Sequence, residues 1–381
     1  MSAARRSKSL RSVARRFGAS LSTLQRWLSR ADGQRLDRVD WSDRSDTPRR
    51  TRRTLRRVER RILTIRRQLA KSVLGECGAL AIRRRLIEEH ISPCPSVRTI
   101  GRVLERLGAL DGRRRVRRPP PPRGWYLPPL AAGHVELDSF DTIEGLAIRR
   151  STHLCILTGI SLHGRLVFAQ PETQFKASSV VDSLLAHWRQ VGLPAYAQFD
   201  NDNRFAGPKQ HRDAIGQVIR LCLALGVTPV FAPPNEMGFQ AGIEHFNGRW
   251  QAKVWARREY RSLKHLQSCS AEFIQAARVQ ATSRSETAPK RSSIPRGWRL
   301  TGQQVLHGMI IFLRRTNDAG QVQVLGRSWP VDKQWTHRLV RAEVDLDQQQ
   351  IRCYALRRRQ PDDQPLLRTT HYALPHRPLR D

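Results

Sequence analysis

The stretch that decides the fold is HVELDSFD at residues 134–141, where a short apolar segment runs into acidic side chains. We interpret residues 135–137 as a strand that ends at Asp138. The apolar segments at 153–161 and 165–170 are also strand-like, and His163 with Gly164 predicts a turn between them. The region is therefore expected to open with three consecutive strands.

Segments of helical and strand length alternate beyond these three strands. In chain order they are a helix at 176–191, a strand at 195–199, a helix near 209–225, a strand at 228–231 and a helix after Phe239. Such an order predicts a mixed sheet flanked by helices.

Three acidic residues fall where this architecture brings distant segments together. Asp138 follows the first strand, Asp200 ends a strand in QFDNDNRF, and Glu244 lies on the last helix in QAGIEHFN. We expect these carboxylates to converge at one edge of the sheet. Hard divalent cations prefer oxygen ligands of this kind, and Mg²⁺ takes further ligands from water and phosphate. Glu136 and Asp141 are the nearest competitors, and we interpret both as structural.

Residues 133–260 resemble the integrase catalytic core of DDE insertion-sequence transposases and retroviral integrases. The resemblance is carried by an Asp after a strand, an Asp-Asn after a later strand, and a helical Glu followed three residues on by Asn. By position, Asp138, Asp200 and Glu244 match the catalytic and metal-binding acids of that family. The resemblance implies an RNase H-like core at 131–260 that uses two Mg²⁺ (or Mn²⁺) ions per active site.

The same resemblance implies a reaction and its partners. A DDE transposase hydrolyses a phosphodiester at each transposon end and transfers the freed strand into target DNA. The implied partners are double-stranded DNA, as transposon ends and as target, and further copies of the chain in a synaptic complex. Whether an ATPase partner selects the target is left open. On the helix that carries Glu244, we expect DNA contacts from Asn247, Arg249, Gln251 and Lys253.

The sequence departs from the family pattern near the second and third acids. Asp202 stands where the family usually has Gly, and the separation of Asp200 from Glu244 is longer than usual. Asp202 is either a salt-bridged surface group or an additional group outside the direct metal ligands. Glu236 remains an alternative to Glu244.

Residues 9–30 have the pattern of a helix-turn-helix, which places a DNA-binding domain at 1–31. Gly18 breaks the first helix and Ser20 can cap the second. The first helix has an apolar face of Leu10, Val13, Ala14 and Phe17. On the second helix, the residues expected to face DNA are Ser22, Thr23, Gln25 and Arg26, and those expected to face the core are Leu21, Leu24, Trp27 and Leu28. An ordinary helical hairpin is the alternative.

Composition and apolar spacing predict the remaining domains. Upstream of the core we expect a basic linker at 32–53, a second helical DNA-binding domain of helix-turn-helix or winged-helix type at 54–112, and an Arg/Pro linker at 113–130. A dimerising helical bundle would show the same spacing as the second domain. Downstream we expect a helical connector at 261–305 and a small β-barrel at 306–375, with a curled sheet as the alternative to the barrel.

The charge of the chain indicates a polyanionic partner. Lys and Arg total 68 against 33 Asp and Glu, a net charge of +35, and residues 1–130 hold 34 basic and 11 acidic side chains, a net +23. DNA contact should therefore begin in the N-terminal third. Six scattered cysteines suggest reduced thiols, and we expect a soluble, cytoplasmic, nucleoid-associated bacterial protein.

Two other functions are compatible with these patterns. One is a catalytically inactive DNA-binding regulator derived from a transposase. The other is an RNase H-like nuclease that cuts DNA without joining it.

Overall fold

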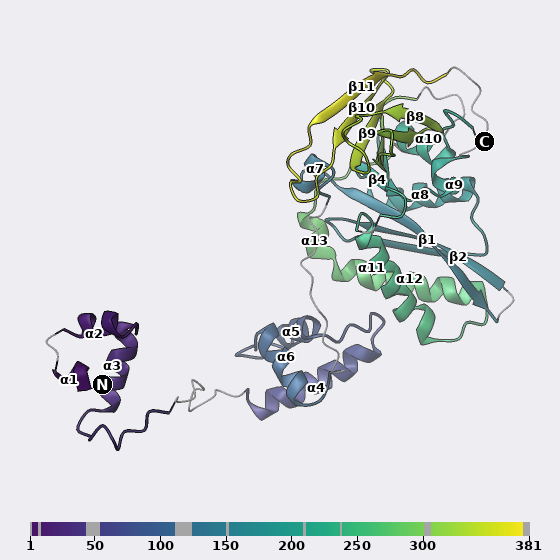
Figure 1. The fold of residues 1–381 in the computed structure, drawn as a ribbon. Coiled ribbons are helices and arrows are strands. Elements are labelled where there is room, and N and C mark those ends of the chain that lie inside the picture. The colour runs from purple at the N-terminus through teal and green to yellow at the C-terminus, as the bar shows by residue number, and fades with distance from the viewer. Residues whose placement is uncertain are drawn as a thin grey trace. The chain divides into compact units, whose positions relative to one another are not determined.

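The computed structural model describes residues 2–6, 9–42, 54–110, 124–149, 152–208, 211–236, 238–300 and 306–375. The chain divides into two units, Met1–Arg56 and Arg57–Asp381, and each is described by itself (Figure 1). None of the described helices is long and apolar enough to cross a membrane. The predicted linkers at 32–53 and 113–130 fall partly outside the described residues, at 43–53 and 113–123.

Within its described residues the first unit holds three short helices, α1 (Ser2–Arg6), α2 (Leu10–Arg16) and α3 (Leu21–Arg30). Ser20 caps α3 as predicted, because the backbone N–H of Thr23 donates to its Oγ at 3.0 Å. The buried centre consists of Ala4, Val13 and Leu24.

Two aromatic residues of this unit do not lie in its core. Phe17 is 61% exposed and Trp27 is 38% exposed, so the prediction that they face inward is wrong. Helices this short enclose only a few small side chains, which leaves no space for two large rings. The guanidinium of Arg16 lies over the Phe17 ring instead, 5.7 Å from its centroid.

The second unit begins with three helices, α4 (Arg56–Lys71), α5 (Ala79–Glu88) and α6 (Val97–Arg106). They lie within the helical domain predicted at 54–112, whose DNA-binding role stays a prediction. Apolar residues from all three helices are fully buried together, among them Ile62, Ile82 and Ile100. The guanidinium of Arg61 donates through Nε to Glu89 at 2.7 Å and joins α4 to the end of α5.

The central region follows the predicted order of strands and helices. Its elements are β1 (Leu137–Ile148), β2 (Thr152–Ser161), β3 (Val167–Glu172), α8 (Ala177–Val191), β4 (Tyr196–Phe199), α9 (Asn203–Ala206), α10 (Gln217–Ala224), β5 (Thr228–Phe231) and α11 (Ala241–Lys253). Strand β1 is longer than expected. Asp138 is its second residue instead of the residue that follows a strand, so the predicted boundary at 135–137 is wrong.

The strands of this region lie in the order β3-β2-β1-β4-β5. Neighbours among β1, β2 and β3 pair antiparallel, whereas β1, β4 and β5 are parallel. Phe140 on one face of β1 belongs to a core shared with α8 and α10. Ile143 on the other face packs with residues of α11 and of α12 (Leu263–Gln280). A mixed sheet in this order, with helices on both faces, fits an RNase H-like integrase core.

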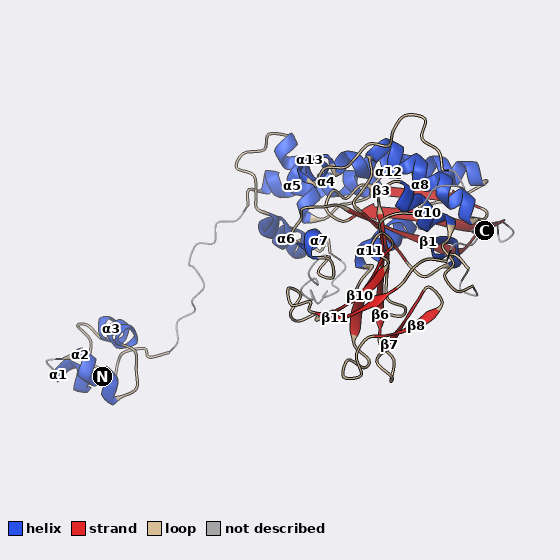
Figure 2. Ribbon diagram, turned by 90° about the horizontal axis from the view of Figure 1, so that it is seen from above, coloured by secondary structure: helices blue, strands red, loops and turns tan. Residues whose placement is uncertain are grey.

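The C-terminal strands continue the central sheet. They are β6 (Met309–Arg315), β7 (Gln321–Val324), β8 (Arg327–Pro330), β9 (Leu339–Asp345), β10 (Gln350–Ala355) and β11 (Leu366–His371). The nine-stranded order is β11-β10-β9-β6-β5-β4-β1-β2-β3, while β7 and β8 pair separately. The prediction of a separate small β-barrel at 306–375 is therefore wrong. Figure 2 shows β6 and β10 turned strongly away from β1 and β3.

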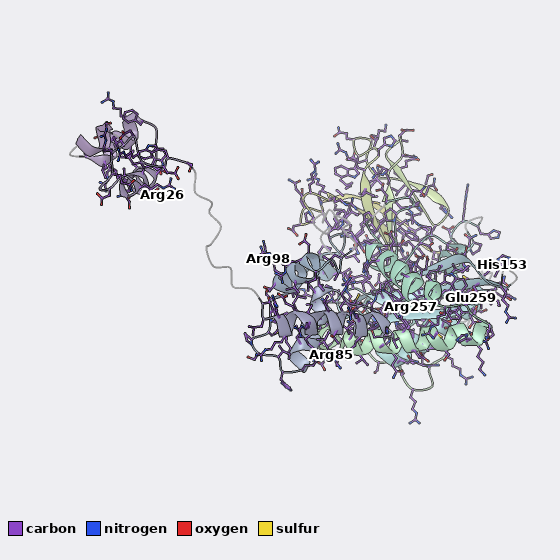
Figure 3. All side chains as sticks on the ribbon, turned by 90° about the horizontal axis from the view of Figure 1, so that it is seen from below. Arg26, Arg85, Arg98, His153, Arg257 and Glu259 are labelled. Atoms are coloured by element: carbon purple, nitrogen blue, oxygen red, sulfur yellow. The ribbon has the colours of Figure 1, made fainter. Side chains whose placement is uncertain are left out.

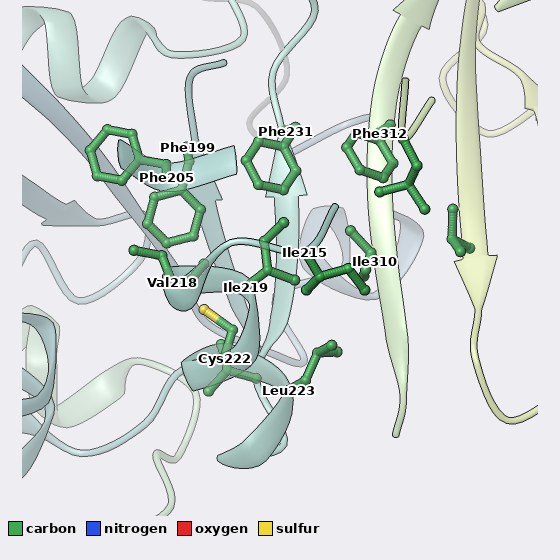
Figure 4. Close-up of a cluster of buried hydrophobic side chains, with 14 of the residues drawn as sticks. Phe199, Phe205, Ile215, Val218, Ile219, Cys222, Leu223, Phe231, Ile310 and Phe312 are labelled. Carbon is green, nitrogen blue, oxygen red and sulfur yellow. The ribbon is translucent and has the colours of Figure 1, made fainter. Parts of the chain in front are cut away.

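The pairing of β6 with β5 has a simple physical reason. Val230 and Phe231 of β5 are fully buried, and without β6 their strand would be an unprotected edge. The rings of Phe231 and Phe312 stack with centroids 5.1 Å apart. Figure 4 shows these rings in one buried cluster with Phe199 and side chains of α10.

The segments on either side of the core pack against it more than the sequence suggested. Trp125, Tyr126 and Leu130 are buried, and Leu130 lies in α7 (Pro128–Ala131). The predicted linker at 113–130 is therefore wrong over its last residues, because these apolar side chains join the core. In the predicted helical connector at 261–305, α12 and α13 (Thr282–Thr287) are helical, and an extended segment follows them.

Candidate active site

Asp141 lies on the face of β1 that is turned toward α11. Asn247 of α11 donates through Nδ2 to Asp141 Oδ2 at 2.8 Å, and the backbone N–H of Thr142 donates to Oδ1 at 2.8 Å. The Thr158 hydroxyl on β2 lies 2.7 Å from Asn247 Oδ1 and donates to it. This bond fixes the amide so that its NH₂ group points to Asp141. Two strands and a helix thus hold one carboxyl group in a single orientation.

Asp200 follows β4, the strand beside β1. The backbone N–H of Asp202 donates to Asp200 Oδ1 at 3.0 Å. Asn201 directly follows Asp200. Its Nδ2 donates to the carbonyl oxygen of Ala232 at 2.7 Å, and its Oδ1 accepts from the guanidinium of Arg314 on β6 at 2.8 Å. The strand added next to β5 therefore helps to fix the loop that carries Asp200.

Glu244 lies in the first turn of α11 and is exposed to solvent. The pKa of Asp141 is raised to about 6, mainly by burial, and the negative charges of Asp200 and Glu244 contribute to this rise. Asp200 and Glu244 therefore both act electrostatically on Asp141. Among the residues that the structure describes, no three His, Cys, Asp or Glu side chains are gathered closely enough to hold a metal ion.

Asp138 does not join the other two predicted acids. It is almost fully buried on the α8 face of β1, where the indole N–H of Trp188 donates to Oδ2 at 3.0 Å. Arg291 forms an ion pair with the same carboxylate at 2.5 Å. The prediction that Asp138 converges with Asp200 and Glu244 is wrong, because strand alternation sends Asp138 and Asp141 to opposite faces. Asp141, on the opposite face of β1, is the acid whose pKa the charges of Asp200 and Glu244 raise.

The other acidic alternatives have structural partners. Glu136 accepts from the backbone N–H groups of His163 at 2.9 Å and Gly164 at 2.8 Å, which closes the turn between β2 and β3. Glu236 forms an ion pair with Arg315 of β6. Of the two candidates for the third acid, Glu244 is therefore the one that acts on Asp141.

Asp202 is an ion-paired helix cap. Its Oδ1 accepts from the backbone N–H of Arg204 at 2.7 Å, and its Oδ2 lies 2.8 Å from the guanidinium of the same residue. Arg204 also pairs with Glu144 at 2.7 Å. This geometry favours the salt-bridged interpretation of Asp202, which begins the short helix α9.

Three of the four residues of α11 that were expected to contact DNA make contacts within the chain. Asn247 is 9% exposed and holds Asp141. Arg249 pairs with Glu76 at 2.9 Å, and Lys253 donates to the carbonyl oxygen of Gly75 at 3.2 Å. Both cations thus bind the loop between α4 and α5. Gln251 is exposed, and its DNA contact stays a prediction.

The loop between α4 and α5 is held by one further cation. Arg257, in the 3₁₀ helix η1 (Trp255–Arg257) that follows α11, donates to the carbonyl oxygens of Ala70, Ser72 and Val73 at 2.9–3.2 Å. Figure 3 labels Arg257 and, on α5, Arg85. The helical module α4–α6 is thus docked on the helix that carries Glu244.

The residues predicted to read DNA lie on α3. Ser22, Gln25 and Arg26 are exposed, and Figure 3 shows Arg26 at the surface of the first unit. Thr23 is half-buried, and its hydroxyl lies 2.7 Å from Ser20 Oγ. These positions allow a groove contact, and the DNA-reading role stays a prediction.

The sequence also indicated a longer strand, which would have pointed to Asp141, but the predicted strand ended too early to include it. Residues 139–148, SFDTIEGLAI, are rich in aromatic and β-branched residues, which favour a strand. Extending the strand over them places Asp138 and Asp141 on opposite faces. Thr158 carried no comparable signal, because its role depends on the pairing of β1 with β2.

Comparison with known proteins finds no match to a family model and no match among curated proteins. Solved structures of retroviral integrases are similar. A simian T-cell lymphotropic virus intasome in complex with PP2A regulatory subunit B56 gamma is 13% identical, with 73% of this chain and 88% of that chain covered and a TM-score of 0.33.

Two catalytic core domains are similar over a shorter part of the chain. That of BIV integrase is 17% identical, with 38% and 82% covered and a TM-score of 0.28. That of HTLV-2 integrase, in complex with magnesium, is 10% identical, with 42% and 88% covered and a TM-score of 0.28. At such low scores, the assignment of the fold rests on the strand order and on the placement of the helices.

Proposed function

We propose that this protein is a DNA-processing enzyme of the transposase and integrase kind, with Asp141, Asp200 and Glu244 as its catalytic acids. The observation that carries the proposal is the placement of Asp141, which Asn247 and Thr142 hold in one orientation on β1, beside the parallel strand β4 that leads into Asp200; its raised pKa, to which the charges of the other two acids contribute, agrees with this placement. Asp200, which follows β4, and Glu244 on α11 both influence this carboxyl group on β1 of an RNase H-like sheet. Perturbed carboxyl groups of this kind are concentrated at functional sites.

The three acids are of the residue type that a divalent cation binds, although in this structure they are not gathered closely enough to hold one. They offer only oxygen ligands, which Mg²⁺ and Mn²⁺ prefer. A bound cation would offset the electrostatic repulsion between these carboxylates. Asp141, Asp200 and Glu244 would hold the cation, which would supply Lewis-acid stabilisation of the phosphoryl oxygens. Asn247 and Thr158 keep Asp141 oriented, and Asn201 with Arg314 keeps the Asp200 loop in place.

The proposed reaction has two displacement steps at phosphorus. Water attacks a phosphodiester at the transposon end, the P–O3′ bond breaks, and a 3′-hydroxyl and a 5′-phosphate result. That 3′-hydroxyl then attacks a phosphodiester of the target, loses its proton and forms a new P–O bond. The target's own 3′ oxygen leaves and takes up a proton. Hydrolysis replaces a P–O ester bond by a P–OH bond, and strand transfer replaces one P–O ester bond by another. Neither step therefore needs an outside energy source.

The distribution of charge supports DNA as the substrate. Residues 1–130 carry a net +23, and their helical segments expose many cations, among them Arg26 on α3 and Arg98 on α6 (Figure 3). Such an excess attracts the DNA backbone independently of base sequence. We propose that these segments hold transposon ends, that further copies of the chain complete a synaptic complex, and that Ser22, Thr23, Gln25 and Arg26 read bases.

Nicking of a supercoiled plasmid tests the proposal. The purified full chain should convert the plasmid to open circles in Mg²⁺ or Mn²⁺ and should leave it intact in EDTA. Asp141→Asn, Asp200→Asn and Glu244→Gln should each abolish nicking. Asp182→Asn is the matched control, because Asp182 is exposed on α8 and lies outside the site.

The products of the reaction separate the alternatives. Joining of a labelled duplex to the plasmid supports a transposase, whereas nicks without joining favour a nuclease. DNA binding without any nicking in either metal would indicate an inactive regulator. Normal nicking by Asp141→Asn would overturn the assignment of this acid.

A further inference from the structure

Three buried polar atoms without a hydrogen-bond partner lie on the same three elements as the three acids. They are Ser139 Oγ on β1, Gln198 Nε2 on β4 and Gln240 Nε2 at the start of α11. Ser139 and Gln198 each come two residues before an acid, and Gln240 comes four residues before Glu244. Side chains two apart on a strand share a face, and those four apart on a helix are about one turn apart. The three polar groups therefore form a layer next to the acids.

All three residues line one cavity of about 230 Å³. Its apolar walls include Tyr126, Phe239, Ile160 and Leu162. The Tyr126 hydroxyl donates to Gln198 Oε1 at 3.1 Å, which holds the amide while its nitrogen stays unpartnered. Gln198 is 1% exposed and Ser139 is 6% exposed, so both polar groups are removed from bulk solvent.

A second hollow, of about 280 Å³, adjoins this cavity. The two share Ile160, Arg165 and His245 as lining residues. The second hollow is also lined by Arg84 of α5, Arg249 of α11 and Arg284 of α13, with Glu76 as its acidic residue. An apolar cavity with polar groups thus lies beside a cation-rich one. This pairing matches a nucleotide, which joins a flat base to a phosphate.

A polar group that is buried without a hydrogen-bond partner destabilises the folded state, because it has lost its hydrogen bonds to water. Three such groups in one cavity are therefore unfavourable unless a ligand or ordered water supplies their partners. The amide nitrogens of Gln198 and Gln240 are donors, and the Ser139 hydroxyl can donate or accept. A ligand that fits offers carbonyl oxygens and ring nitrogens on a flat, partly apolar body.

We propose that this cavity binds an unpaired base of the DNA strand that is cut, turned out of the helix beside the scissile phosphate. The inference rests on the proposed function and specifies the substrate of that site. The base lies between the apolar walls, and its edge accepts from Gln198 and Gln240. Its phosphate lies toward Arg165 and the cation-rich hollow. Enzymes that act on DNA gain selectivity by binding a base that has left the stack.

Binding of a tailed duplex tests this inference without any cleavage. The full chain is titrated, in EDTA and at fixed salt, with a duplex that carries an unpaired 3′ tail of a few nucleotides. A second duplex differs only by abasic sites in the tail. The wild type should bind the first DNA roughly 5- to 150-fold more tightly, as expected for one or more stacked bases. Salt is held fixed because the phosphate term depends strongly on it.

Variants test whether the preference for the base-carrying tail over the abasic tail arises in this cavity. Gln198→Leu keeps most of the volume and removes the donor, so it should bind both DNAs with similar affinity. Gln240→Leu should do the same, and because Gln240 is only partly buried this variant is the safer one for folding. Gln275→Leu is the matched control on the exposed face of α12 and should keep the wild-type preference.

Each other outcome overturns the inference. Equal binding of the two DNAs by the wild type would exclude a base site, and full preference in both Gln198→Leu and Gln240→Leu would place the site elsewhere. Equal binding together with a higher melting temperature for Gln198→Leu would show that the cavity holds only water. Because these measurements need no metal, they stay separate from the nicking assay, which alone tests the catalytic acids.

Discussion

Arg291 donates from both terminal nitrogens to the carboxylate of Asp138, at 2.9 Å to Oδ1 and at 2.5 Å to Oδ2. The same guanidinium donates to the carbonyl oxygen of Gly192 at 3.0 Å. Next to it, Ser292 pairs with Leu193 in an isolated bridge. This ion pair ties the extended segment after α13 to the first strand, so the acid that the sequence motif placed in the active site stabilises the fold instead.

Replacing Asp138 should therefore affect stability. Asp138→Asn leaves Arg291 with an uncompensated buried charge, which we expect to lower the free energy of unfolding by roughly 3–5 kcal/mol. Urea denaturation of the purified variant measures this. The double variant Asp138→Leu with Arg291→Met removes both charges and should be less destabilised than Asp138→Asn. If the Asp138→Asn variant kept its full stability and lost its nicking activity, Asp138 would be a catalytic residue after all.

Divalent cations should stabilise the wild type through the three acids. A ligand that binds only the folded state adds about 2.7 kcal/mol at 100 times its Kd. We expect Mg²⁺ to raise the melting temperature of the wild type and to leave that of Asp141→Asn nearly unchanged. In metal-free buffer Asp141→Asn should itself melt higher, because it removes a carboxylate whose charge is disfavoured. An equal Mg²⁺ response in both proteins would show that the cation binds elsewhere.

The sequence predicted the order of the central elements because each has a clear apolar period. It misplaced one acid because the length of β1 was underestimated, and in a strand a change of one residue moves a side chain to the other face. The parallel pairing of β6 with β5 was not predicted from the sequence, because it joins residues about eighty positions apart. Long-range pairing of this kind leaves no local periodicity to read.

Histidine 187 should make stability sensitive to acid. Burial lowers the pKa of His187 to about 3 from its ordinary value of 6.5, and the nearby charges of Arg278 and Arg291 lower it as well, while Asp138 opposes them. As pH falls below about 6.5, the unfolded chain takes up a proton that the folded chain does not. The folded state should then lose roughly 1.4 kcal/mol per pH unit from this group.

The variant His187→Gln isolates that contribution. Glutamine can still accept from Arg278, whose guanidinium lies 3.1 Å from His187 Nδ1. Denaturation curves at several pH values between 6.5 and 4.5 should therefore show a shallower loss of stability in the variant than in the wild type. Parallel pH profiles would mean that His187 is protonated in the folded protein as well.

Arg257 should control the docking of the α4–α6 module on α11. Its guanidinium donates to three backbone carbonyl oxygens at the end of α4, although the side chain is exposed. We expect Arg257→Ala to speed amide hydrogen exchange in residues 69–76 several-fold while leaving β1 and β4 protected. Arg261→Ala, at an exposed site nearby, is the matched control. Unchanged exchange in residues 69–76 would show that other contacts hold the module.

Arg26 should contribute to base recognition as well as to charge. If α3 enters the major groove, Arg26→Ala removes a base contact worth roughly 1–3 kcal/mol and flattens the preference among DNA sequences. Arg15→Ala on α2 removes the same charge from an exposed position outside the predicted reading helix. Selection of bound sequences from a random duplex pool compares the two variants with the wild type. We expect Arg15→Ala to weaken binding to all sequences alike, because a phosphate contact carries no base information. A preserved sequence preference in Arg26→Ala would mean that this arginine also contacts only the backbone.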